Sequence, residues 1–138
     1  MGYRSYINIK IEFRKEVSEE RIKEICKRFN DKIELSRVEY AKDSNALILF
    51  YDYIKWYTGF IPEVDDVVKI MKEYGNKSLE DDNFDIQSVQ FARIGESDDD
   101  AETEYYGEPD DWLEIERSIY KGRGRFEELK LDLDKEEK

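Results

Sequence analysis

The first part of the chain alternates apolar and polar residues with a period of two. Ile7, Ile9 and Ile11 fall on one side of an extended segment that runs from Tyr3 to Phe13. Each of these isoleucines is followed by a polar residue: Asn8, Lys10 and Glu12. This pattern is typical of a strand with one face in the core and the other in water. We therefore expect a half-buried strand at the start of the chain.

Two later segments repeat apolar residues every three or four positions, which is the period of a helix. The first begins at Ser18, a good capping residue, and runs to Asn30. The second begins at Pro62, which suits a first helical turn, and runs to Tyr74, where Gly75 supplies a left-handed cap. The apolar residues expected on the buried faces are Ile22, Ile25, Cys26, Phe29, Val64, Val67, Val68, Met71 and Tyr74.

Further strands are expected between and after the helices. The first runs from Ile33 to Tyr40. Its alternation of apolar and polar residues changes phase, which indicates a bulge near residues 36–37. Residues 46–57 begin with apolar side chains on both faces, as in a central strand. Residues 84–94 return as a strand, and a last one at 112–120 is predicted from the spacing of Leu113, Ile115 and Ile119.

This order of elements predicts an α+β fold. Strand, helix, strand, strand, helix, strand is the split βαβ arrangement of ferredoxin-like folds, here with one extra C-terminal strand and both helices on one face. The length favours a single α+β domain over residues 1–125, followed by a charged, partly ordered tail over residues 126–138. Seven residues are expected to be buried: Ile7, Ile9, Ile22, Phe29, Ile48, Val67 and Met71.

Composition removes several classes of function. The sequence has no run of about 18 apolar residues and no signal-peptide pattern, so we expect a cytoplasmic protein with no membrane partner. It has no His and one cysteine, Cys26. These counts exclude an intrachain disulfide and remove the commonest metal ligand and general base. We expect no enzymatic activity, no cofactor and no metal, with Cys26 as a small core residue.

The charge of the chain is concentrated in one segment. Between Glu96 and Glu116 there are eleven carboxylates and no Lys or Arg, whereas the other 117 residues hold 24 acids against 23 bases. Nearly all of the net charge of −12 therefore lies in this segment, which we call the acidic block. Such a local field repels nucleic acid and attracts basic surfaces. We expect the block to form an exposed loop held at its ends by the flanking strands.

The charged residues allow other interpretations. A calcium loop starting at Asp98 would place Thr103 where an EF-hand requires Gly, and Pro109 where it requires a bidentate Glu. The basic residues Lys121, Arg123 and Arg125 suggest phosphate contacts, but we favour a neutralising turn that faces the acidic block. Aromatic residues that remain exposed would be candidate anchors for a partner. The sequence leaves open which of five these are: Trp56, Tyr57, Tyr105, Tyr106 and Trp112.

A resemblance to known proteins covers roughly residues 54–120. It rests on residues 56–57 (Trp-Tyr), residues 62–64 (Pro-Glu-Val) and the run from Phe91 to Glu102 that leads into the acidic block. These features resemble small acidic accessory proteins of phages and mobile elements of Gram-positive bacteria. The resemblance implies a counter-defence role, as in anti-CRISPR and anti-restriction inhibitors that act by stoichiometric binding. It implies no catalytic residues.

We therefore expect a phage-type inhibitor that acts in the host cytoplasm. Its expected partner is a host nucleic-acid-binding defence protein, such as a CRISPR effector, bound through an acidic, nucleic-acid-mimicking surface without direct binding of nucleic acid. The residues expected to bind this partner are Glu96, Asp98, Asp99, Asp100, Glu102, Glu104, Tyr105, Tyr106, Glu108, Asp110, Asp111 and Trp112.

Two alternatives remain open. The first is a non-inhibitory accessory domain that self-associates, as a homodimer, through the sheet edge or the aromatic residues while the acids only solvate it. The second is a sponge that sequesters a nucleotide signal. It would hold phosphate with basic residues chosen from Arg93, Arg117, Arg123 and Arg125.

Overall fold

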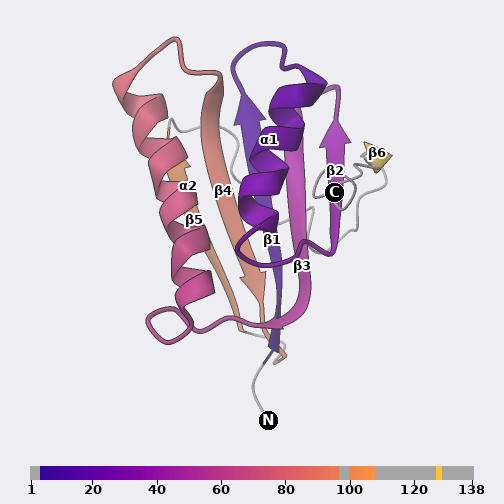
Figure 1. Ribbon diagram of the computed structural model, residues 1–138, viewed down its shortest axis with the longest axis vertical. Helices are drawn as coiled ribbons and strands as arrows, with labels where there is room; N and C mark the ends of the chain where they lie inside the picture. The colour runs from indigo at the N-terminus through magenta and orange to yellow at the C-terminus, as the bar shows by residue number, and fades with distance from the viewer. Residues whose placement is uncertain (1–3, 97–99, 108–126, 129–138) are drawn as a thin grey trace.

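The computed structural model describes residues 4–96, 100–107 and 127–128 of the chain (Figure 1). Two helices and six strands lie in these residues. Their bounds are β1 Arg4–Phe13, α1 Glu19–Asn30, β2 Arg37–Ala41, β3 Ala46–Lys55, α2 Pro62–Glu80, β4 Ile86–Ile94, β5 Ala101–Gly107 and β6 Glu127–Glu128. The sequence therefore predicted both helices and most of these strands, although it ended the second helix at Tyr74 rather than at Glu80.

The strands form one antiparallel sheet in the order β5-β4-β1-β3-β2-β6. Both helices lie on the same face of this sheet (Figure 1). The α+β class is confirmed, but the sheet is not a simple split βαβ sheet, because β5 extends it beyond β4 and the two-residue β6 extends it beyond β2. No helix among the described residues is long and apolar enough to cross a membrane.

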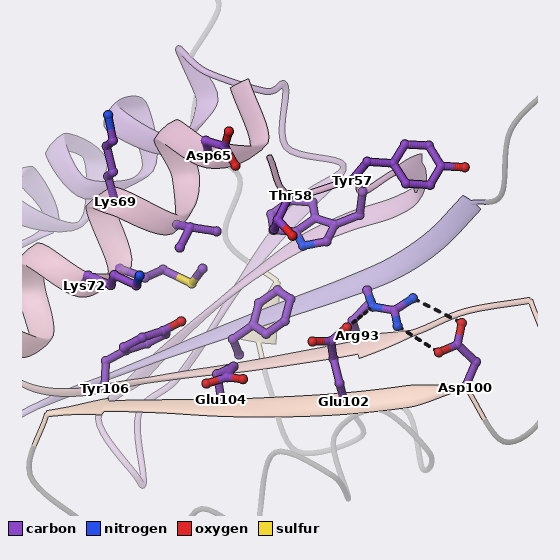
Figure 2. Close-up of a pocket in the computed structure, with 14 residues that line it drawn as sticks. Tyr57, Thr58, Asp65, Lys69, Lys72, Arg93, Asp100, Glu102, Glu104 and Tyr106 are labelled. Carbon is purple, nitrogen blue, oxygen red and sulfur yellow. Dashed lines mark hydrogen bonds and ion pairs between the residues drawn. The ribbon is translucent and has the colours of Figure 1, made fainter. Parts of the chain in front are cut away.

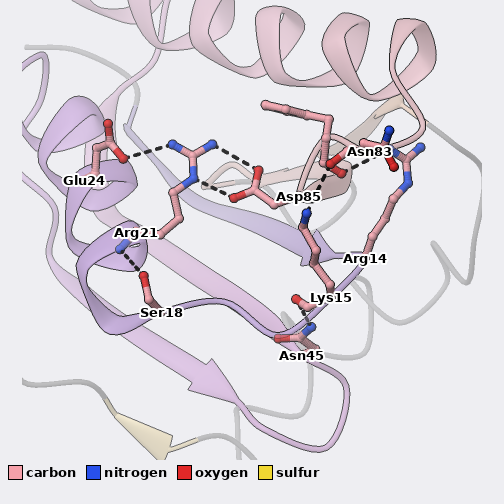
Figure 3. A network of polar contacts seen from close by, with 9 residues as sticks. Arg14, Lys15, Ser18, Arg21, Glu24, Asn45, Asn83 and Asp85 are labelled. Carbon is pink, nitrogen blue, oxygen red and sulfur yellow. Dashed lines mark hydrogen bonds and ion pairs between the residues drawn. The ribbon is translucent and has the colours of Figure 1, made fainter.

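Helix α1 follows its local sequence signals closely. The Ser18 side chain accepts a hydrogen bond from the backbone N–H of Arg21 at 3.1 Å, which caps the first turn. The Arg21 guanidinium then reaches Asp85, just before β4, at 2.7 Å and so ties the helix to the sheet (Figure 3). The residues expected on the buried face are all buried: Ile22, Ile25, Cys26 and Phe29.

Helix α2 is longer than expected. Gly75 is not a C-terminal cap, because the helix continues through it to Glu80. The helix ends instead where Arg14 at the end of β1 donates hydrogen bonds to the carbonyl oxygens of Ser78 and Asp81, both at 2.9 Å. These contacts satisfy carbonyl groups that the end of a helix leaves without partners. A long-range contact therefore sets the length of α2.

The expectation of a half-buried β1 is wrong, because both of its faces are buried from Ile7 to Phe13. Lys10 is 0% exposed and Glu12 is 6% exposed. Lys10 Nζ lies 3.6 Å from Glu12 Oε2, and Glu12 Oε1 accepts hydrogen bonds from Ser88 at 2.9 Å and Gln90 at 3.3 Å. Burial of such charges is tolerated when they are paired and hydrogen-bonded. The side chains of Asn8, Lys10 and Glu12 thus form a buried polar layer on the face of β1 away from the helices.

The other strands differ from expectation mainly at their ends. Residues 33–35 lie outside β2, although Ile33 and Leu35 still pack against the core. The seven residues predicted to be buried are at most 5% exposed. The last strand, predicted at 112–120, lies outside the described residues, whereas an unexpected strand, β5, forms inside the acidic block.

Candidate functional site

Strand β5 replaces part of the loop that the acidic block was expected to form. Its residues pair with β4 in antiparallel register, with Glu104 opposite Phe91 and Tyr106 opposite Val89. Thr103, Tyr105 and Tyr106 are residue types with high strand propensity. The density of negative charge hid this signal in the sequence. The ordered part of the block is therefore a strand at the sheet edge.

A groove of about 740 Å³ runs between α2 and the strands β4 and β5 (Figure 2). Trp56 and Phe91 line its floor, with their rings stacked 5.5 Å apart. Lys72 lines it from α2, and Glu104 lines it from β5. Tyr106 also lines it, at the point where α2 and β5 come into contact. The groove therefore brings part of the acidic block together with basic and aromatic side chains.

The basic residue Arg93 forms ion pairs with two carboxylates of the block. Its guanidinium contacts Asp100 at 2.8 Å and Glu102 at 2.6 Å, and it also donates to the Ser5 hydroxyl at 3.0 Å (Figure 2). Burial alone would lower the pKa of Arg93, but these hydrogen bonds and charges outweigh it and raise the pKa. Sequence reasoning missed this partner because Arg93 precedes the block in the chain. The net negative charge of the surface near Arg93 is therefore smaller than the number of carboxylates in the sequence implies.

The remaining expected site residues are dispersed. Glu96 is exposed, and its carboxylate accepts a hydrogen bond from the backbone N–H of Arg4 at 2.9 Å. Glu104 is exposed and forms no ion pair with any residue that the structure describes. Tyr105 and Tyr106 are half-buried on opposite faces of β5. Six expected site residues lie outside the described residues: Asp98, Asp99, Glu108, Asp110, Asp111 and Trp112.

The structure also separates core aromatics from exposed ones. Trp56 is only 8% exposed and belongs to the core, so it is not a candidate anchor. Tyr57 is half-buried at the mouth of the groove. Burial and then the nearby charges of Glu104 and Glu102 raise the pKa of Tyr106, so its hydroxyl stays protonated. The uncharged ring of Tyr106 therefore lines the same groove as the carboxylates of Glu102 and Glu104.

Metal and thiol chemistry find no support in the described part of the chain. No group of three or more His, Cys, Asp or Glu side chains there is arranged to hold a metal ion. Cys26 is buried in the core, and burial raises the pKa of its thiol to about 12. A thiol with so high a pKa is a poor nucleophile at neutral pH.

Comparisons with known proteins do not place the chain in a family. No protein-family model matches the sequence, no curated protein matches it, and no solved structure matches the fold. We therefore base the proposed function on the contacts, burial and charge of this chain.

Proposed function

We propose that the chain is a non-enzymatic inhibitor of the phage counter-defence type, which binds a host nucleic-acid-handling protein such as a CRISPR effector. The binding surface is the acidic side of the sheet around β5. The observation that carries this proposal is that β5 holds carboxylates of the acidic block in a fixed register with β4. Fixed charges steer a basic partner and define its orientation.

The spacing of the carboxylates limits how closely this surface can imitate the charge of duplex DNA. Carboxylates on alternate residues of a strand recur about every 6.7 Å, whereas duplex DNA carries one charge per about 1.7 Å of its axis. In addition, Glu102 shares its charge with Arg93. Strand β5 therefore supplies only part of the charge density of a duplex. We infer that the acids set the association rate and that aromatic contacts supply much of the affinity.

We also propose that the scaffold under this surface is ferredoxin-like. The order β4-β1-β3-β2, with all neighbours antiparallel, supports this assignment. In this view β5 is an addition to the outer edge of a split βαβ unit.

The nucleotide-sponge alternative is less well supported. Arg93, the described arginine that it invoked, already binds Asp100, Glu102 and Ser5. A phosphate would have to displace these carboxylates. The accessory-domain alternative is distinguished from inhibition by the experiment below.

The test starts with affinity capture of a defence nuclease or effector from the lysate of a candidate host. The captured protein is then titrated with the wild type, with Glu104→Gln and with the control Glu34→Gln, which changes an exposed acid outside the groove. We expect a stoichiometric complex that competes with duplex DNA for the captured protein. Its affinity should fall with added salt and by about two- to fivefold in Glu104→Gln only, as for one exposed ion pair.

Two results would contradict the proposal. The first is that the purified chain itself binds duplex DNA or RNA with submicromolar affinity at physiological salt, which the net charge of −12 opposes. The second is that the complex leaves the nucleic-acid binding of the captured protein unchanged, which would favour a non-inhibitory accessory domain.

A further inference from the structure

The groove between α2 and β5 is long enough to hold an extended peptide. On the strand side it is lined by every second residue from Asp100, just before β5, to Tyr106 (Figure 2). Alternate residues of a strand recur about every 6.7 Å, so the groove extends for about 20 Å along β5. This length exceeds that of a single amino acid and matches about six residues of an extended chain.

The walls of the groove are set by the packing of α2 on the sheet. Helix and strand are in contact at Gly75 and Tyr106. The helix residues that line the groove all come before this contact, within residues 65–72. The stacked rings of Trp56 and Phe91 lie between the two elements. The groove is therefore bounded by a helix on one side, a strand on the other and an apolar floor.

The two walls present charges of opposite sign. On the strand wall, Arg93 already holds Asp100 and Glu102 in ion pairs. By contrast, Lys72 on the helix wall and Glu104 on the strand wall form no ion pair within the part of the chain that the structure describes. Figure 2 shows Lys72 coming from α2 and Glu104 from β5, on opposite sides of the groove. A ligand in the groove therefore meets a positive charge on one side and a negative charge on the other.

We propose that this groove binds an extended segment of the protein partner in which basic and acidic residues alternate. This inference rests on the proposed function, in which a protein approaches β5, and it names the kind of segment that lies against the groove. Successive side chains of an extended chain point to opposite sides. The basic side chains of such a segment then face Glu104 while its acidic side chains face Lys72. Complementary charge on both walls fixes the orientation of the segment.

Two tyrosines add apolar contact area to the groove. Tyr57 and Tyr106 both line it and are half-buried, so each ring keeps part of its surface for a ligand. The methylene groups of a lysine or arginine side chain can cover such a ring while the charged head reaches a carboxylate. Tyr57 and Tyr106 thus supply the aromatic contacts that the wide spacing of the acids requires, in place of the buried Trp56.

The test uses two fluorescein-labelled peptides of equal composition, titrated against the full chain by anisotropy at low salt. One consists of four Lys-Glu repeats, and the other of four lysines followed by four glutamates. Their net charges are the same, so nonspecific attraction to the protein does not separate them. The wild type should bind the alternating peptide at least about threefold more tightly, because only this peptide places the two signs on opposite sides.

Single charge removals identify the walls. Lys72→Gln and Glu104→Gln should each weaken binding of the alternating peptide by about two- to fivefold, as for the loss of one exposed ion pair. The matched controls Lys27→Gln on α1 and Glu34→Gln remove charges outside the groove and should leave binding unchanged. All four variants should melt within about 2 °C of the wild type, so that a weaker complex reports binding and not folding.

Two results of these titrations would overturn the proposal. The first is equal binding of the two peptides by the wild type. The second is a loss of binding in Glu104→Gln without a loss in Lys72→Gln, which would leave only an acidic surface. A dimer in sedimentation experiments that Lys72→Gln dissociates would assign the groove to a second copy of the chain and would also overturn it.

The captured defence protein separates this inference from the proposed function. If Glu104→Gln weakens the complex with that protein but Lys72→Gln does not, the alternating segment fails and the proposed function stands. If the alternating peptide binds through both residues but no complex inhibits a defence protein, the proposed function fails and the groove remains a peptide-binding site.

Discussion

Gly75 on α2 and Tyr106 on β5 are in direct contact. A Cβ atom added to Gly75 would lie 2.5 Å from Tyr106 Cβ and 3.0 Å from the backbone N of Gly107. Because one of these neighbours is backbone, neither a rotamer change nor a small shift relieves the contact. The absence of a side chain at position 75 therefore allows α2 to lie close to the edge strand that carries the acidic residues.

Gly75→Ala should destabilise the protein although it improves helix propensity. Replacing Gly by Ala inside a helix normally gains about 1 kcal/mol, whereas overpacking costs about 1–3 kcal/mol. We expect a net loss of up to about 2 kcal/mol in the free energy of unfolding, measured by urea titration. The neighbouring control Asn76→Ala is exposed and should be neutral or slightly stabilising. Equal stabilisation by both substitutions would show that α2 and β5 are not in close contact.

Local signals explain which elements the sequence could predict. Ser18 and the apolar period of α1 are within one segment, and the start of α2 is set by Pro62 itself. The end of α2 was missed because Gly75 serves a contact with β5 and because Arg14, more than sixty residues away in sequence, caps the last turn. A glycine followed by polar residues looks the same in sequence whether it ends a helix or lies under a strand.

The buried polar layer was missed for a similar reason. Alternation predicts which residues share a face, and it did so correctly for β1, but it does not show whether that face is covered. Lys10 and Glu12 are indistinguishable in sequence from a solvated pair. The long-range hydrogen-bond partners of Glu12, Ser88 and Gln90, appear only when β4 lies beside β1.

Lys10→Met should test this buried pair. Removing one partner of a buried ion pair leaves the other charge uncompensated and costs about 3–5 kcal/mol. The control Lys69→Met removes an exposed lysine and should change stability by less than about 0.5 kcal/mol. The double variant Lys10→Met with Glu12→Leu should be more stable than Lys10→Met alone, because the Lys10–Glu12 ion pair is then removed as a unit. Guanidinium unfolding curves of all three provide the comparison.

The acid sensitivity of the fold should depend partly on Glu73. The Arg28 guanidinium contacts this carboxylate at 2.5 Å and, chiefly through that hydrogen bond, lowers the pKa of Glu73 from its ordinary 4.5. A carboxyl group with a lowered pKa in the folded state stabilises the protein at neutral pH. That contribution is lost as the pH falls from about 4.5 through the lowered pKa.

Glu73→Gln should therefore reduce stability at pH 7 and converge with the wild type in strong acid. The difference is small, because the pair is exposed and solvent screens it. Melting temperatures measured between pH 7 and pH 2 provide the test, with Glu34→Gln as the control. A constant difference between Glu73→Gln and the wild type across this range would contradict the assigned ion pair.

The amino-acid composition indicates which segment holds the candidate site, but it does not show which charges of that segment form ion pairs. The excess of acids between Glu96 and Glu116 is visible in the sequence, but the pairing of Asp100 and Glu102 with Arg93 depends on the β4–β5 register. For this reason, removing all acids of the block at once would take away both carboxylates that Arg93 binds, and an effect on folding could not be separated from an effect on partner binding. Single changes at Glu104 avoid this effect, since Glu104 forms no ion pair within the described residues.

Changes at Glu104 remove a negative charge from this surface, whereas Arg93→Gln removes a positive charge. It releases Asp100 and Glu102 from their ion pairs, so the surface becomes more negative without any added acid. Loss of hydrogen bonds to charged groups should cost about 1–3 kcal/mol of stability. At the same time, the variant should bind a basic probe, a fluorescein-labelled peptide of four Gly-Arg repeats, more tightly than the wild type at low salt and equally at high salt. Anisotropy titrations at two ionic strengths, with urea unfolding alongside, measure both effects. Weaker binding of the folded variant at low salt would mean that Arg93 itself contacts the partner and that the acids around it do not attract one.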